Sequence, residues 1–125
     1  MTKTVMVVDD DIPNLTVMGL LLKKIGYSAI TIHNGWDALA AIKEKKPDLI
    51  LLDLMMTPID GWQFLDELRK EGLSKLPVML FTAKYIRDEE IAPYKKDIIQ
   101  ILQKPVSLRE LEVALHDFFQ SRSDT

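Results

Sequence analysis

The sequence has no cysteine, no long apolar run and no excess of basic side chains. Without cysteine, the chain can form neither a disulfide framework nor a thiolate metal site or nucleophile. No apolar run approaches the roughly 18 residues that span a membrane, and the N-terminal residues lack the longer apolar segment of a signal peptide. We therefore expect a cytoplasmic protein without a membrane partner.

A net charge of −3 gives the chain no basic footprint, so we expect no direct contact with nucleic acid. The glycine-rich nucleotide-binding motifs G-x-x-x-x-G-K-[ST] and G-x-G-x-x-G are also absent. Apolar residues make up 47% of the chain and charged residues 28%, which is ordinary for a soluble globular protein. A length of 125 residues suits one core, so we expect a single domain over 1–125.

Short apolar runs alternate along the chain with segments of helical periodicity. A short apolar run bounded by turn signals is typical of a strand buried on both faces. The runs predict strands at 4–8, 28–32, 49–53, 77–82 and 97–102. The intervening segments predict helices from the cap Asp11 to Gly26, from Gly35 to about Lys46, from Asp60-Gly61 to near Gly72, over 86–92 where Pro93 limits the helix, and from the capping box Ser107–Glu110 to a polar tail at 121–125.

Five strands that alternate with five helices predict an α/β protein. Right-handed crossovers between parallel strands place helices on both faces of the sheet, which gives a three-layer sandwich. The sequence does not itself determine the strand order. A sheet that brings the ends of the first and third strands together favours the flavodoxin-like order 2-1-3-4-5.

The predicted strands end in a set of polar side chains. In an open parallel sheet, ligands bind just beyond the carboxyl ends of the strands. The residues there are Asp9 and Asp10 after the first strand, Asp53 at the third, Thr82 at the fourth and Lys104 after the fifth. Carboxylates brought together at one edge repel each other unless a positive partner lies among them.

This set of side chains indicates phosphoryl transfer. Two or three carboxylates suit a hard divalent cation such as Mg²⁺, which takes one or two carboxylates plus phosphate oxygens. A carboxylate can also act as a nucleophile and form an acyl phosphate. Lys104 would supply a second positive charge, and the Thr82 hydroxyl would donate a hydrogen bond to a phosphoryl oxygen. Phosphoryl transfer needs little beyond such positioning and charge neutralisation.

Each residue also has a purely structural interpretation. Acids at 9–11 can cap a helix, which we expect for Asp11, while Thr82 alone would be a strand-end hydroxyl and Lys104 alone a solvated lysine. We expect the large aromatic residues to pack in the core or between helices, and the histidines to be structural or exposed. These residues are Trp36, Trp62, Phe118 and Phe119, and His33 and His116.

Together the motifs resemble the response-regulator receiver domain of the CheY-like type. The matching segments, in the family's order and roughly its spacing, are Val7-Val8-Asp9-Asp10, Asp53, Asp60-Gly61, Thr82-Ala83 and Lys104-Pro105. The match covers nearly the whole chain, and the set is far more specific than any one motif. The resemblance implies a phosphorylation-dependent switch of a two-component or phosphorelay system.

The resemblance also implies roles for the residues of the acid cluster. Asp53 resembles the phosphoacceptor. Asp10 resembles a direct ligand of Mg²⁺, with Mn²⁺ as a substitute, and Asp9 would act largely through water. The backbone carbonyl of Met55 would be a further metal ligand.

The remaining implications concern the switch and its partners. Thr82 and Lys104 resemble the pair that engages the phosphoryl group and relays the switch. The implied donor is a sensor histidine kinase or a histidine phosphotransfer protein. The implied output runs through the face of helix 4, strand 5 and helix 5 to an unknown downstream protein. Such a domain assists its own phosphorylation and dephosphorylation but is not a turnover enzyme.

The chain departs from the family pattern at several positions. Thr57 stands where the family usually has proline, and Pro58 follows it. Ile101 replaces an aromatic residue that often acts as a rotamer switch, and Pro93 interrupts the fourth helix. Met55 and Lys84 occupy the positions, two residues after Asp53 and Thr82, that tune dephosphorylation. Because an apolar Met55 cannot hydrogen-bond an attacking water, we expect slow autodephosphorylation.

Three other functions fit parts of the pattern. A flavin carrier can have the same fold, but its phosphate site requires an anion-binding loop. This chain has three acids in that loop, and they would repel a phosphate unless a cation lay between them. A phosphatase of the haloacid dehalogenase type would use Asp9 and Asp11, but Pro13 stands where its threonine or valine belongs, and the chain has no room for a cap domain. A receiver that signals without phosphorylation conflicts with the intact set of acids, Thr82 and Lys104.

Overall fold

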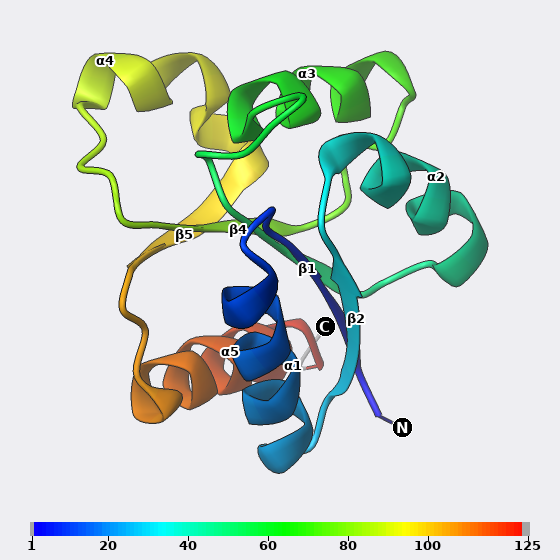
Figure 1. Ribbon diagram of the computed structural model, residues 1–125, viewed down its shortest axis with the longest axis vertical. Coiled ribbons are helices and arrows are strands. Elements are labelled where there is room, and N and C mark those ends of the chain that lie inside the picture. The colour runs from blue at the N-terminus through cyan, green and yellow to red at the C-terminus, as the bar shows by residue number, and fades with distance from the viewer. Residues whose placement is uncertain (1, 124–125) are drawn as a thin grey trace.

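A computed structural model describes residues 2–123 as one parallel sheet between two layers of helices (Figure 1). The strand order is β2-β1-β3-β4-β5 with every neighbouring pair parallel, which confirms the predicted order. The strands are β1 (Thr4–Val8), β2 (Ser28–Ile32), β3 (Leu49–Leu52), β4 (Val78–Thr82) and β5 (Ile98–Gln103).

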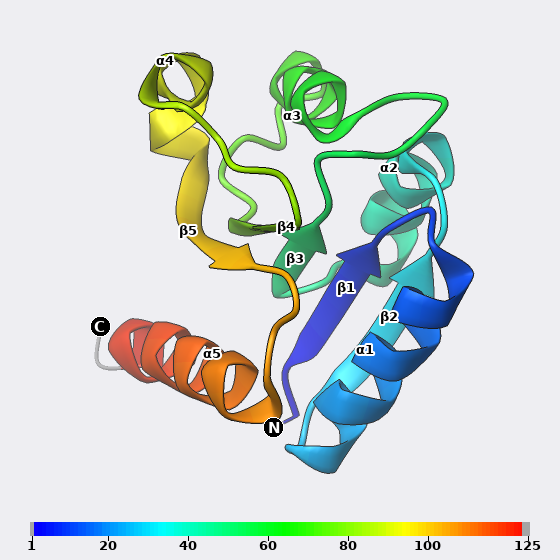
Figure 2. The same ribbon diagram turned by 60° about the vertical axis from the view of Figure 1, so that its left-hand side comes forward.

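Helices cover both faces of this sheet. In Figure 2, α1 and α5 lie on one face, and α2 and α3 lie on the other. The helices are α1 (Ile12–Lys24), α2 (Gly35–Lys45), α3 (Gly61–Lys70), α4 (Asp88–Ile91) and α5 (Leu108–Ser123), with a 3₁₀ helix, η1 (Ala92–Asp97), after α4. The three-layer α/β sandwich is therefore confirmed. None of the helices within residues 2–123 has the length and apolar character needed to cross a bilayer.

The apolar runs become the central strands because both of their faces are covered. All of β3 and β4, and β1 from Val5 to Val8, are buried. Alternate residues of each strand enter different cores: Ile50 and Leu52 pack with α2 and α3, whereas Leu49 and Leu51 pack with α1 and α5.

Side-chain caps form at three of the predicted helix N-termini. The Asp11 carboxylate accepts a bond from the Asn14 N–H, and Asp60 forms a reciprocal capping box with Gln63. At α5, the Ser107 hydroxyl accepts from the Glu110 N–H and donates to the Glu110 carboxylate. Asp11, Asp60 and Ser107 are thus the residues directly before α1, α3 and α5.

The structure corrects several details of the prediction. Residues 86–92 do not form one helix: α4 spans only Asp88–Ile91, and a 3₁₀ helix follows, because Pro93 has no N–H to continue the α-helical bonding. The predicted tail at 121–125 is helical as far as Ser123, and 124–125 lie outside the described residues. Trp36 is 48% exposed and not in the core, while strand β5 begins and ends one residue later than predicted.

Candidate functional site

Asp9 and Asp53 face each other because β1 and β3 are neighbours in the sheet. The Asp53 N–H donates to the Val8 carbonyl at 3.0 Å, so both acids follow directly on paired strand residues. Carboxylate oxygens of Asp9, Asp10 and Asp53 lie within 4.8 Å of one another. The structure thus brings together the three acids predicted from sequence.

A lysine from the far side of the sheet joins this cluster. Lys104 Nζ lies 2.9 Å from Asp9 Oδ2 and 3.3 Å from Asp53 Oδ2. Asp9 is fully buried, and Asp53 is only 4% exposed. Such buried acids need a positive partner, and Lys104 supplies the positive charge that was predicted in addition to a divalent cation.

Burial and the neighbouring charges shift the pKa of Asp53 and of Lys104. Burial raises the pKa of Asp53 to about 6, and the Asp9 charge adds to this, although Lys104 and the Met55 N–H oppose it. Burial by itself would lower the pKa of Lys104. The hydrogen bond to Asp9 and the charge of Asp53 outweigh burial, so the pKa of Lys104 is raised.

The oxygen atoms of the cluster fit a hard divalent cation. Asp9 is engaged at both oxygens: Oδ1 accepts from the Asp11 N–H at 3.0 Å, and Oδ2 accepts from Lys104. Asp10, in contrast, is exposed at the mouth of the site. This difference fits Asp10 as a direct ligand and Asp9 as a residue that acts through water. Such an acidic pocket is what the resemblance to receiver domains implies for Mg²⁺ binding.

Thr82 and Lys104 lie side by side because β4 pairs with β5. The Lys104 N–H donates to the Thr82 carbonyl at 2.9 Å, and the fully buried Thr82 hydroxyl accepts from the Lys84 N–H at 3.1 Å. The Lys104 ammonium also lies over the Phe81 ring, 4.6 Å from its centre. The two predicted residues therefore share the edge at which the acids lie.

The departure at Thr57 has a visible consequence. The Thr57 N–H donates to Asp10 Oδ2 at 3.1 Å, a bond that proline at this position could not make. The missing proline is evident in the sequence, but the bond to Asp10 is not, because the two residues lie on different loops. The signal available in the sequence was the regained N–H donor close to an acidic cluster.

Met55 lies at the rim of the site. Its N–H donates to Asp53 Oδ1 at 3.2 Å, and its side chain is 61% exposed. A cavity of about 460 Å³ opens here, and it is lined by the segments after β1, β3 and β4 and by the start of α3. The lining residues are Asp10, Leu54, Met55, Met56, Thr57, Asp60, Trp62 and Lys84.

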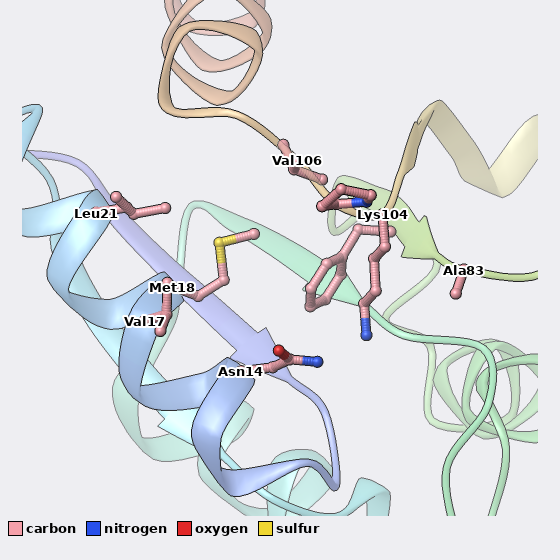
Figure 3. A pocket seen from close by; sticks show the side chains of 9 residues that line it. Asn14, Val17, Met18, Leu21, Ala83, Lys104 and Val106 are labelled. Atoms are coloured by element: carbon pink, nitrogen blue, oxygen red, sulfur yellow. The ribbon is translucent and has the colours of Figure 1, made fainter.

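A second hollow lies on the other side of Lys104. Its volume is about 310 Å³, and α1 forms one wall while the segment after β5 forms the other (Figure 3). Its lining is mostly apolar and consists of Asn14, Val17, Met18, Leu21, Phe81, Ala83, Lys104, Pro105 and Val106. The other residues considered in the sequence are remote from this chemistry: His33 and His116 are both exposed, as expected.

The chain was then compared with known proteins. Residues 5–116 match the family model described as the response regulator receiver domain. The transcriptional regulatory protein ZraR of Klebsiella oxytoca is 34% identical over 113 residues, which cover 90% of this chain and 25% of that protein. The chain thus spans about a quarter of the length of that relative.

Solved structures agree with this match. The N-terminal domain of a response regulator receiver protein from Methanoculleus marisnigri JR1 is 35% identical, with a TM-score of 0.77 over 91% of this chain and 94% of that one. A CheY-like receiver domain protein from Methanospirillum hungatei JF-1, at 19% identity, shares the fold with a TM-score of 0.87 over 99% of this chain and 98% of that one. This chain therefore belongs to the response regulator receiver domain family of two-component systems.

Proposed function

We propose that this receiver domain accepts a phosphoryl group on Asp53 in a reaction that depends on Mg²⁺. The observation that carries the proposal is the cluster of Asp9, Asp10 and Asp53 with Lys104 among them. The donor would be the phosphohistidine of a sensor kinase or of a histidine phosphotransfer protein. The domain assists its own phosphorylation but does not turn over a substrate.

In the proposed step, a carboxylate oxygen of Asp53 attacks the phosphorus atom of the donor. The P–N bond of the phosphohistidine breaks, and its electron pair returns to the imidazole nitrogen. Lys104, already in contact with Asp53, meets the charge that builds up on the phosphoryl oxygens. Thr82 is placed at the end of β4 to donate its hydroxyl proton to a phosphoryl oxygen.

Mg²⁺ would be held by Asp10, Asp53 and the Met55 carbonyl, with Asp9 acting through water, and would neutralise charge on the phosphoryl oxygens. The chain's own contacts keep these ligands in place. The Thr57 N–H orients Asp10, and the Met55 N–H orients Asp53. Burial raises the pKa of Asp53 to about 6, so at pH 7 and above it is mostly the carboxylate that attack requires.

The output face proposed for this domain comprises α4, β5 and α5. A phosphoryl group carries close to two negative charges, which replace the single carboxylate charge of Asp53, and adds strong hydrogen-bond acceptors there. Ile101 has no aromatic ring to swing, so the signal must reach this face through other contacts. Of the alternatives, a flavin carrier has no support at the site, since Asp9, Asp10 and Asp11 occupy the loop where its phosphate would bind.

The proposal is tested by intact-protein mass spectrometry after incubation with acetyl phosphate and Mg²⁺. We expect the wild-type chain to gain the mass of one phosphoryl group. Asp53→Asn should gain none, whereas the matched control Asp117→Asn, on the exposed side of α5, should behave as wild type. A chelator added before the donor should prevent the gain. Equal labelling of Asp53→Asn, or labelling that withstands the chelator, would contradict the proposal.

A further inference from the structure

Lys84 contacts both the acid site and helix α4. Its backbone N–H donates to the Thr82 hydroxyl at 3.1 Å, and its side chain lines the same 460 Å³ cavity as Asp10 and Met55. Its ammonium nevertheless points to α4, where Nζ lies 3.0 Å from Glu90 Oε2. One residue therefore joins the mouth of the site to the helix beside it.

A phosphoryl group on Asp53 would change the charge balance at this place. The ammonium of Lys104 is already shared between Asp9 and Asp53. Among the described residues that line the cavity, Lys84 is the only cation. The phosphoryl group would bring three strong acceptor oxygens, which offer the Lys84 ammonium an anionic partner besides Glu90 even though Mg²⁺ and Lys104 also contact them.

The Lys84–Glu90 pair is also easy to separate. The Lys84 side chain is 45% exposed and flexible, so moving its ammonium costs little desolvation. Glu90 would keep a partner, because Oε1 accepts from the Arg87 N–H at 3.3 Å and lies 3.6 Å from Arg87 Nε. The exchange leaves neither charge unpaired.

Helix α4 depends on side-chain contacts of this kind. It is a single turn, and within residues 88–97, which include η1, no side chain is buried. Loss of the Lys84 contact would therefore loosen the link between α4 and the end of β4. This route needs no aromatic residue at position 101.

We propose that the Lys84 ammonium binds Glu90 in the unphosphorylated protein and moves to the phosphoryl oxygens when Asp53 carries a phosphoryl group. Lys84 is then both a phosphoryl ligand and a positioning residue for α4. The inference rests on the proposed function of Asp53. It adds a specific contact through which the state of the site reaches the α4 face.

The exchange is tested by the affinity for beryllofluoride, a mimic of a carboxylate-bound phosphoryl group, in the presence of Mg²⁺. Tryptophan fluorescence follows binding, since Trp62 lines the cavity. Glu90→Gln removes the competing partner and should tighten binding about twofold to fivefold, the range expected for an exposed ion pair. Lys84→Met should weaken binding about threefold to tenfold, because a charge-assisted hydrogen bond is lost.

The double variant separates partner exchange from a general effect of charge. If Glu90 acts only by holding Lys84, Glu90→Gln should change nothing once Lys84→Met is present. Additive effects would overturn the proposal, as would unchanged or weaker binding in Glu90→Gln alone, or unchanged binding in Lys84→Met alone.

A matched ion pair far from the site supplies the control. Lys43 at the end of α2 pairs with Glu71 at the end of α3 at 3.1 Å, and both Lys43→Met and Glu71→Gln should bind beryllofluoride as wild type does. Failure of the proposed function has a different signature. In that case Asp53→Asn would bind the mimic as well as the wild type, and both proposals would fall.

Discussion

The central strands of the sheet and its β5 edge are held in different ways. In the centre, β3 and β4 are buried at every residue, and β1 is buried from Val5 to Val8. These strands lie between two cores, one formed with α1 and α5 and the other with α2 and α3. At the β5 edge, Leu102 is the only buried residue of β5, and no residue within 88–97 is buried. We refer to residues 83–103 as the α4–β5 edge.

Within the α4–β5 edge only Ile86 and Leu102 are buried, so side-chain contacts contribute more to holding this edge than to holding the central strands. Trp62 of α3 stacks on Tyr94 with ring centres 4.8 Å apart, and Arg69 forms an ion pair with Asp97 and donates to the Pro93 carbonyl at 2.7 Å. Such contacts cost less to break than a core, so this edge can repack while the central strands stay fixed. The acids of the site follow the buried strands β1 and β3, whereas Lys84 lies within the α4–β5 edge and Lys104 directly follows it.

The largest expected effect is on the free energy of unfolding, when an aromatic residue is removed from each of the two regions. Phe64 of α3 is fully buried, so Phe64→Ala should lower the free energy of unfolding by about 3–5 kcal/mol. Tyr94→Ala removes a partly buried stacking partner and should cost only about 1–2 kcal/mol. Urea denaturation measures both values, and equal losses would mean that the edge is held as firmly as the core.

Mg²⁺ should stabilise the protein through the fixed region. A ligand at 100 times its Kd adds about 2.7 kcal/mol to the free energy of unfolding. Asp10→Asn should abolish this gain and cost little by itself, because Asp10 is exposed. Urea denaturation with Mg²⁺ or a chelator provides the comparison. If Mg²⁺ stabilised Asp10→Asn as much as the wild type, Asp10 would not be a ligand of the metal.

The pH dependence of stability tests the burial of Asp53. Its folded pKa of about 6 lies above the unfolded value near 3.8, so the buried charge destabilises the fold at pH 7 and is neutralised as the pH falls through 6. In chelator, Asp53→Asn should be about 1–2 kcal/mol more stable than wild type at pH 7.5, with allowance for partial solvent screening. The difference should disappear towards pH 4. If the stability difference between Asp53→Asn and the wild type did not change with pH, Asp53 would not be the group whose buried charge destabilises the fold.

A smaller effect is expected at the rim between the two regions. Met55 cannot position a water molecule for attack on the acyl phosphate, but an asparagine amide can. Met55→Asn should shorten the phosphoryl lifetime roughly tenfold, which corresponds to about one hydrogen bond in the transition state. Loss of phosphate from the purified protein, followed by mass spectrometry, measures the lifetime, and an unchanged lifetime would rule out this role.

The two regions also differ in how far their sequence predicted them. Apolar runs such as 49–52 and the cap Asp11 determined the central strands and the first helix, since burial and capping leave local signatures. The positions of Asp53 and Lys104 followed from the rule that sites lie at strand ends. The chemistry could thus be placed once a parallel sheet was inferred.

The α4–β5 edge was predicted less well because non-local contacts decide its structure. Nothing near Pro93 in the sequence shows that the Arg69 side chain donates a hydrogen bond to the Pro93 carbonyl. The Lys84–Glu90 pair joins a loop residue to a helix residue six positions later, a contact that no sequence periodicity indicates. The bond from Thr57 to Asp10 needed the spatial approach of two loops.

Hydrogen–deuterium exchange of the phosphorylated chain tests the central claim most directly. We expect phosphorylation with acetyl phosphate and Mg²⁺ to change exchange within 83–103 and to leave residues 4–8 and 49–52 unchanged, with no change anywhere in Asp53→Asn treated identically. Unchanged exchange within 83–103, or a change spread evenly over the central strands, would contradict a fixed site that signals through a movable edge.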